Sequence, residues 1–161
     1  MWDGTRGLFW IGFGPRSDAV ARDVVEDQFG MPAVALELVD PRFYHMDTAL
    51  CPLTHGEVIY VPGAFTSLGQ TMIRDRVEPG LRIELAPEDA CQFAANTVCL
   101  GSTLVMSGCS ARLRHELEKR GYRVVPTPLP SFQRSGGSAF CLTLRLDRDS
   151  NRGAVQQTAV A

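Results

Sequence analysis

A histidine and an aspartate in the sequence Tyr-His-Met-Asp, residues 44–47, form the first group of side chains that can do chemistry. A strand is expected to begin at Asp47. His45 and Asp47 are two positions apart, so an extended backbone would direct both side chains to the same face. An imidazole and a carboxylate can converge there on one small cation. Taken alone, a histidine beside an acid is more often a structural pair than a catalytic one.

A cysteine that follows a pair of glycines forms the second group, in Ser-Gly-Gly-Ser-Ala-Phe-Cys-Leu-Thr at residues 135–143. Glycines at such a place allow the backbone to approach a ligand closely. Without a partner, Cys141 would be interpreted as a buried core residue after a flexible loop. Together with His45 it predicts a nucleophile pair, in which the thiolate reacts and the imidazole exchanges protons.

Both groups belong to a chain with a repeated order of elements, ββαβ. The hydrophobic periodicity and the Gly and Pro breaks predict two complete units. The first has strands at 47–53, 57–61 and 81–85, with a helix capped by Thr66. The second has strands at 97–100, 103–106 and 122–127, with a helix at 110–120. A short helical turn is expected between them, at 87–96.

Incomplete units are expected at both ends of the chain. The N-terminal one has strands at 8–13 and 33–39 and a helix at 18–29 capped by Ser17, and it lacks a first strand. The C-terminal one consists only of a strand at 140–146, which carries Cys141. Residues 1–148 are therefore expected to form one partial α/β domain, and the polar segment 149–161 a disordered tail.

Composition excludes several classes of partner. The chain has 45% hydrophobic and 21% charged residues, and 16 Lys and Arg against 18 Asp and Glu give a net charge of -2. Basic residues form no cluster, so nucleic acid is not expected as a partner. No apolar run approaches the roughly 20 residues that cross a bilayer, and the N-terminus does not resemble a signal peptide. A cytoplasmic protein without a membrane segment is the expectation.

The cysteines give no sign of a metal site. There are five, irregularly spaced and without a C-x-x-C pair, so neither zinc nor a redox centre is predicted. Cys51, Cys91, Cys99 and Cys109 are expected in core or strand positions, as free cysteines usually are. His55, in a turn, and His115, on a helix face, are expected to be exposed and structural.

Two motifs resemble the pentein superfamily, which includes arginine deiminases, dimethylarginine dimethylaminohydrolases and amidinotransferases. They are H-x-D-T at residues 45–48 and G-G-x-x-x-C-x-T at residues 136–143. That superfamily builds an α/β propeller from five ββαβ units. The resemblance therefore implies an incomplete propeller of about three units.

The resemblance also implies roles for individual residues. Cys141 matches the nucleophile, His45 the acid/base residue and Asp47 the carboxylate that holds the guanidinium. Arg16, in Gly-Pro-Arg-Ser at residues 14–17, matches the arginine that holds the substrate carboxylate. The implied activity is hydrolysis of the guanidino group of arginine or a methylated arginine through a thiouronium intermediate, with no metal or organic cofactor.

The sequence departs from the superfamily pattern in two places. The acidic residue that orients the histidine belongs to an E-G-G/A-G-D motif that would precede Trp2, so Met1 is interpreted as an internal start. Function is then expected to require an upstream segment, self-association or a complementing subunit. In the dimethylarginine enzymes, the position that corresponds to Asp47 is commonly not an aspartate. This difference weakens the case for a methylated substrate.

Three alternatives to a guanidine hydrolase stay open. An amidinotransferase would pass the amidino group to an amine instead of water. A truncated, non-catalytic fragment would act as a binding or assembly module through its exposed strand edges. An unrelated cysteine hydrolase acting on amides would share the Cys–His pair but would leave Arg16 and Asp47 unexplained.

Overall fold

Three small sheets with one shared topology form the framework of the chain. The computed structural model describes residues 1–144. In each sheet the first strand runs antiparallel to the second, and the second runs parallel to the third, which is reached through a helix. The mixed α/β fold that the sequence predicts is therefore confirmed.

The elements of the three units follow one another along the chain. The first unit has β1 (Trp2–Asp3), β2 (Leu8–Phe13), α1 (Ala21–Phe29) and β3 (Ala33–Glu37). The second has β4 (Leu50–Pro52), β5 (Val58–Tyr60), α3 (Ser67–Arg76) and β6 (Arg82–Glu84). The third has β7 (Val98–Leu100), β8 (Thr103–Met106), α5 (Ala111–Lys119) and β9 (Arg123–Pro126).

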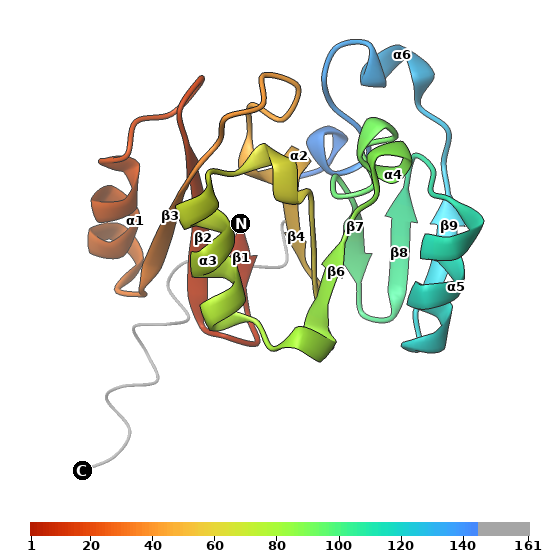
Figure 1. The fold of residues 1–161 in the computed structure, drawn as a ribbon, viewed down its shortest axis with the longest axis horizontal. Coiled ribbons are helices and arrows are strands. Elements are labelled where there is room, and N and C mark those ends of the chain that lie inside the picture. The colour runs from red at the N-terminus through yellow and green to blue at the C-terminus, as the bar shows by residue number, and fades with distance from the viewer. Residues whose placement is uncertain (145–161) are drawn as a thin grey trace.

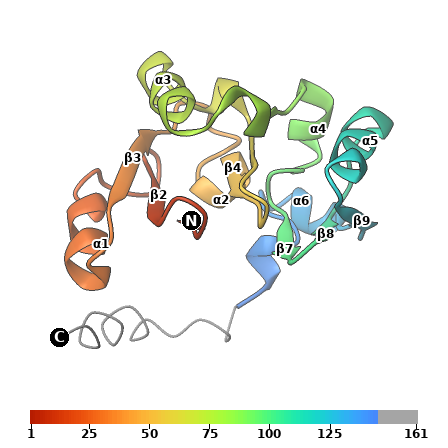
Figure 2. The same ribbon diagram turned by 90° about the horizontal axis from the view of Figure 1, so that it is seen from below.

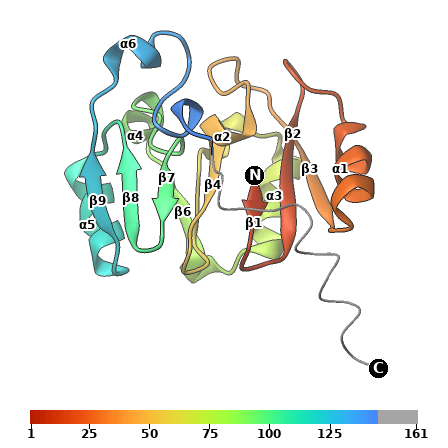
Figure 3. The same ribbon diagram turned by 180° about the vertical axis from the view of Figure 1, so that it is seen from behind.

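Short helices lie between the units, within the second unit and after the third. The α-helical ones are α2 (Met46–Ala49), α4 (Pro87–Cys91) and α6 (Pro130–Gln133). The 3-10 ones are η1 (Pro62–Ala64), η2 (Pro79–Leu81) and η3 (Phe140–Leu142). Figures 1 and 3 show that α2, α4 and α6 lie at one end of the sheets and the hairpin turns at the other. Seen from below, the sheets follow an arc with α1, α3 and α5 on its outer side (Figure 2).

A continuous hydrophobic core passes through the three units. The central strand β5 is buried along its whole length, since Val58, Ile59 and Tyr60 have no exposed surface. A strand flanked on both sides and covered on both faces favours such an uninterrupted apolar run. Each fully buried side chain of this size contributes about 1.5–3 kcal/mol relative to exposure. The middle sheet is therefore the rigid base from which α2 and the site described below extend.

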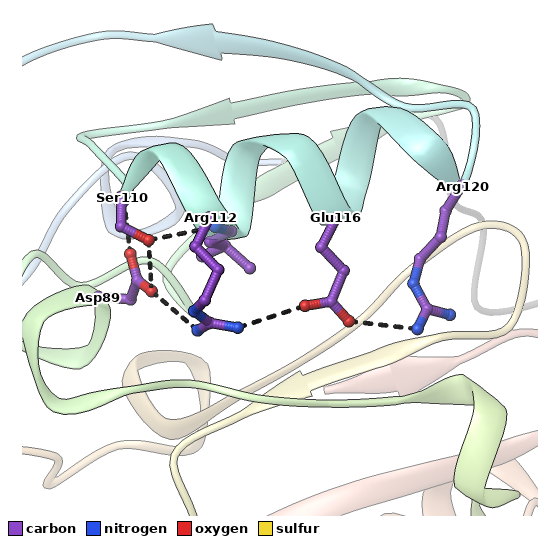
Figure 4. Close-up of polar contacts among 6 residues, drawn as sticks. Asp89, Ser110, Arg112, Glu116 and Arg120 are labelled. Carbon is purple, nitrogen blue, oxygen red and sulfur yellow. Dashed lines mark hydrogen bonds and ion pairs between the residues drawn. The ribbon is translucent and has the colours of Figure 1, made fainter.

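A chain of polar contacts joins α4 to α5 (Figure 4). The buried carboxylate of Asp89 accepts hydrogen bonds from the backbone N–H of Ser110, at 2.6 Å, and from its hydroxyl, at 3.0 Å. The Ser110 hydroxyl in turn accepts from Leu113 N and caps α5. Arg112 and Glu116 continue the chain along the helix to Arg120. These contacts fix the second unit against the third.

Most element boundaries agree with those predicted from the sequence. Thr66 caps α3, accepting a hydrogen bond from Gly69 N, and the turn predicted at 87–96 contains α4. The first unit was predicted to lack its first strand, and this is wrong. The short strand β1 pairs with β2 at Trp2 and Asp3. Its length of two residues gives no periodicity from which to predict it.

The start of α1 also differs from the prediction. The helix begins at Ala21 with Val20 as its N-cap, and Ser17 does not cap it. Asp18 Oδ1 instead accepts a hydrogen bond from Val20 N, and this local turn delays the helix. The predicted apolar stripe of α1 is present but uncovered within residues 1–144, because Val20, Val24 and Phe29 are exposed.

The cysteines predicted to be structural lie in different surroundings. Cys51 is buried in β4, and Cys99 and Cys109 are partly buried. Cys91 is exposed at the end of α4, so its predicted core position is wrong. None of the helices within residues 1–144 is long and apolar enough to cross a membrane.

Candidate active site

The segment that carries His45 and Asp47 is helical where a strand was predicted. The His45 carbonyl accepts hydrogen bonds from both the backbone N–H and the hydroxyl of Thr48, and these bonds close the turn of α2. His45 itself has an extended backbone and is the N-cap of this helix. The two side chains therefore do not share a strand face, and the strand β4 begins only at Leu50.

Cys141 lies in the 3-10 turn η3, and not in the predicted strand. The described part of that strand, residues 140–144, has no strand partner, and Leu142 and Leu144 are 49% and 83% exposed. Its alternating apolar residues therefore have no sheet surface to cover. The rest of the predicted strand, like the predicted tail at 149–161, lies outside the described residues.

Cys141 and Asp47 are in direct contact at the upper end of the sheets. The Sγ atom of Cys141 lies 3.0 Å from Asp47 Oδ2, to which the thiol donates a hydrogen bond. The pKa of Cys141 is raised above its ordinary value, first by burial and then by this carboxylate. Burial and the negative charge of Asp47 therefore both favour the protonated form of this thiol.

Asn96 is a residue of the site that the sequence did not reveal. It is completely buried between α4 and β7. Its Nδ2 atom lies 2.9 Å from Asp47 Oδ2 and 3.1 Å from Cys141 Sγ. Its Oδ1 atom accepts from the backbone N–H groups of Ser138, at 3.0 Å, and Cys141, at 3.3 Å. No motif marks this asparagine, and only the folded chain brings it to the cysteine.

The glycine pair before Cys141 allows the loop to pack against two site residues. A Cβ atom on Gly137 would lie 3.1 Å from Cys141 Sγ, a tight contact. Gly136 has φ of +82° and lies against Tyr44, whose ring leaves no room for a side chain there. The Tyr44 hydroxyl donates to the carbonyls of Ser135 and Gly136. Tyr44, also missed from the sequence, thus attaches the loop to the histidine segment.

His45 and Cys141 line one cavity of about 280 Å³. The cavity walls come from the segment before α2, from α6 and from the loop that follows it; the lining residues are Tyr44, His45, Phe132, Ser135, Gly136, Gly137, Ser138, Cys141 and Leu142. The exposed His45 ring packs edge-on against Tyr44, with centroids 4.9 Å apart. The sulfur and the imidazole therefore face the same small space.

Arg16 lies at the edge of this site and does not line the cavity. Its guanidinium carbon is 5.1 Å from the centroid of the Tyr44 ring, a cation–π contact, and the residue is exposed. Of the four residues selected from the sequence, the structure joins Cys141 and Asp47 directly, places His45 in the same cavity and connects Arg16 through Tyr44.

The arrangement brings a thiol, an imidazole and a carboxylate that matches a planar cation close together. A carboxylate accepts two guanidinium N–H bonds in one plane, which makes it a specific partner for this group. Within residues 1–144, no cluster of three or more His, Cys, Asp or Glu side chains could hold a metal ion.

Comparison with known proteins identifies relatives of similar sequence and fold. No protein-family model matches the chain. The bifunctional arginine dihydrolase/ornithine cyclodeaminase AgrE of Nostoc sp. is 42% identical over 137 residues, which cover 85% of this chain and 20% of AgrE. The dimethylarginine dimethylaminohydrolase of Mycobacterium tuberculosis is 34% identical over 135 residues, which cover 84% of this chain and 44% of that enzyme.

The N-terminal domain of ArgZ, a cyanobacterial arginine dihydrolase, gives the structural comparison. It was solved as a cysteine-to-serine mutant bound to substrate, and it matches with a TM-score of 0.83 and 37% identity over 85% of this chain and 51% of that one. The same domain was also solved covalently bound to a reaction intermediate, with a TM-score of 0.87. The chain thus spans about a fifth of full-length AgrE and about half of the ArgZ domain.

Proposed function

The chain belongs to the pentein superfamily of guanidine-modifying enzymes, and on that premise we propose that it hydrolyses the guanidino group of arginine or a methylated arginine. Cys141 is the nucleophile in this proposal, His45 the acid/base residue, and Asp47 and Arg16 hold the substrate. The three sheets are consecutive units of the propeller that this superfamily forms. No metal or organic cofactor takes part, and the protein acts in the cytoplasm.

The first half of the reaction forms a covalent adduct. The S–H proton of Cys141 passes to His45, and the thiolate attacks the guanidinium carbon and forms a C–S bond, while Asp47 accepts the N–H groups of the substrate. The C–N bond to the leaving nitrogen then breaks, and His45 supplies the proton with which ammonia or an alkylamine departs. A thiouronium remains on the sulfur.

The second half releases the product. His45, now neutral, takes a proton from a water molecule, whose oxygen attacks the thiouronium carbon. The C–S bond breaks, the sulfur takes a proton back from His45, the hydroxyl proton of the product passes to the solvent, and citrulline leaves. Division of one difficult displacement into two easier steps is the advantage of covalent catalysis.

One observation carries this proposal: the nucleophile and the guanidinium-binding carboxylate are in contact. The Cys141 sulfur lies 3.0 Å from Asp47 Oδ2, in reach of the cavity that His45 lines. A guanidinium bound by that carboxylate would place its carbon beside the sulfur. The ArgZ domain, with its substrate bound in a cysteine mutant, supports arginine as the substrate class.

An amidinotransferase is the second candidate, because the same residues would serve if an amine replaced the attacking water. The relatives described above are hydrolases by name, which supports water as the acceptor. A transferase would release ornithine from arginine only when an acceptor amine is present.

Product analysis of the purified chain tests the proposal. Citrulline and ammonia are measured after incubation with arginine, and citrulline and dimethylamine after incubation with dimethylarginine, beside a Cys141→Ser control. Turnover that the control abolishes supports the proposal. Specific activity that rises with protein concentration would indicate that self-association completes the site. A folded chain with no turnover on either substrate, at any concentration, would contradict hydrolysis by this chain and leave a non-catalytic binding module.

A further inference from the structure

Asn96 connects the three parts of the site, and the reaction described above does not involve it. Its side chain contacts Asp47 in α2, Cys141 in η3 and the backbone of the glycine loop. Its backbone carbonyl also accepts a hydrogen bond from Phe140 N at 3.2 Å. Burial of an amide costs free energy unless its N–H and C=O groups form hydrogen bonds, and the side chain of Asn96 forms several.

The hydrogen bonds fix the orientation of this amide. The N–H groups of Ser138 and Cys141 can only donate, so the atom that faces them must be the amide oxygen. The NH₂ group is therefore the one that faces Asp47 and the cysteine sulfur. A flipped amide would direct donors at donors on one side and an oxygen at a carboxylate on the other.

The NH₂ group has two hydrogens and three acceptors within reach. They are the Asp47 carbonyl at 3.1 Å, Asp47 Oδ2 at 2.9 Å and Cys141 Sγ at 3.1 Å. Burial and Asp47 raise the pKa of Cys141, whereas the Ser138 backbone and the Asn96 amide act in the opposite direction. When a guanidinium occupies the Asp47 carboxylate, the amide hydrogen shared with it becomes free for the sulfur.

We propose that Asn96 stabilises the Cys141 thiolate by donating an amide hydrogen to Sγ, while its oxygen holds the nucleophile loop in place. The inference deepens the proposed function, on which it rests, because a stabilised thiolate is useful only if Cys141 is the nucleophile. Hydrogen bonds to a charged group are roughly twice as strong as neutral ones, so the bond gains strength as the thiolate forms.

Within residues 1–144, few charged groups lie near Cys141. Asp47 contacts it from α2, and His45 shares its cavity. The Met1 ammonium interacts with Asp47, and burial lowers its pKa to about 6. Measurements above about pH 7.5 keep that amine neutral, so the titration of the thiol can be separated from it.

The test is the pH dependence of alkylation of Cys141 by iodoacetamide, followed by peptide mass spectrometry. In Asn96→Ala the donor is lost, so alkylation at about pH 7.5 should fall about tenfold and the profile should move to higher pH. Asn96→Asp keeps an acceptor for the loop N–H groups but loses the donor, and it should fall at least as far. Cys91, which is exposed in the same molecule, should react at an unchanged rate and serves as the internal control.

If Asn96 has only a structural role, its loss should make the alkylation of Cys141 faster and not slower. Cys141 is an exposed residue even in the intact loop. Loss of the asparagine would then release the loop, move the sulfur away from Asp47 and lessen the burial that raises its pKa, so alkylation would become faster. Unchanged or faster alkylation of Cys141 in Asn96→Ala would overturn the proposal. The readout needs no substrate, so absence of citrulline formation would sink the proposed function without touching this result.

A measurement on the unaltered asparagine covers the case in which both variants fail to fold. The side-chain NH₂ resonances of Asn96 in a ¹⁵N-correlated NMR spectrum should shift through the titration of Cys141. The same step should be missing in Cys141→Ser, which keeps Asn96 intact. Resonances that do not respond to pH above about 7.5, or that respond equally in both proteins, would contradict the proposal.

Discussion

The sulfur of Cys141 and the carboxylate of Asp47 lie 3.0 Å apart, although 94 positions separate the two residues in the chain. The contact joins the middle unit, through α2, to the loop that follows the third unit. Burial raises the pKa of this cysteine most, and the contact raises it further, because a carboxylate disfavours a second negative charge beside it. Under the proposed function, a cationic substrate is what removes this obstacle.

Substitution of Asp47 by Asn should make Cys141 more reactive towards a neutral electrophile. Burial raises the pKa of this thiol most and would remain, but the contribution of the carboxylate would be lost. Below the pKa, each unit by which it falls gives about ten times more thiolate, so alkylation by iodoacetamide at pH 7 should accelerate several-fold. Asp75→Asn, an exposed substitution on α3, is the matched control. A slower reaction would show that Asp47 does not disfavour the thiolate.

Substitution of Gly137 by Ala should disturb the nucleophile more than the fold. The added methyl group would lie 3.1 Å from Cys141 Sγ, so the sulfur or the loop must move. A shift of a few tenths of an ångström relieves the contact, so we expect turnover, or labelling by a haloacetamidine, to fall several-fold, because a reacting atom must be held in an accurate position. Gly63→Ala, where a methyl group meets open space, is the control. Equal labelling of both variants would argue against a preformed site.

Substitution of Asp89 by Ala should destabilise the junction between the second and third units. The carboxylate is completely buried and accepts two hydrogen bonds from Ser110 at the start of α5 (Figure 4). Its loss leaves a buried N–H without an acceptor, which costs about 1–3 kcal/mol. Urea unfolding measures the change, and Glu88→Ala at the exposed neighbouring position should stay within about 0.5 kcal/mol of the parent.

Two tyrosines that bond to glutamates should differ in their contribution to stability. The Tyr122 hydroxyl donates to Glu57 Oε2, a buried carboxylate, whereas Tyr60 donates to Glu84, which is exposed. Tyr122→Phe should therefore lower the free energy of unfolding by about 1.5–3 kcal/mol, as expected when a hydrogen bond to a charged group is lost. In Tyr60→Phe water can replace the lost donor, and the decrease should be smaller. Thermal unfolding of both variants decides whether the order is correct.

The repeated architecture could be predicted from the sequence, because strands and helices bury one face and leave a period in the hydrophobic pattern. Thr66 is a recognisable helix cap for the same local reason. The order of His45, Asp47 and Cys141 could also be matched to a family.

The parts that the sequence did not predict depend on tertiary hydrogen bonds. The segment around Asp47 is helical because the His45 carbonyl binds Thr48 twice. Residues 138–141 form a turn in which three backbone N–H groups point to Asn96. A single asparagine without periodic neighbours carries no sign of such a role, so the fold is needed to find it.

Under the proposed function, Arg16 binds the α-carboxylate of the substrate, a role that an unrelated cysteine hydrolase acting on amides would not require. Its guanidinium stacks on the Tyr44 ring and lies outside the cavity wall, so it can bind only the end of the substrate far from the sulfur. Arg16→Ala should raise KM about ten-fold or more for arginine and leave kcat nearly unchanged, as expected for loss of an interaction equal in ground and transition states. For a guanidine without an α-carboxylate, KM should not change. Arg22→Ala on the exposed face of α1 controls for the loss of positive charge, and an equal rise of KM for both substrates would remove Arg16 from the carboxylate site.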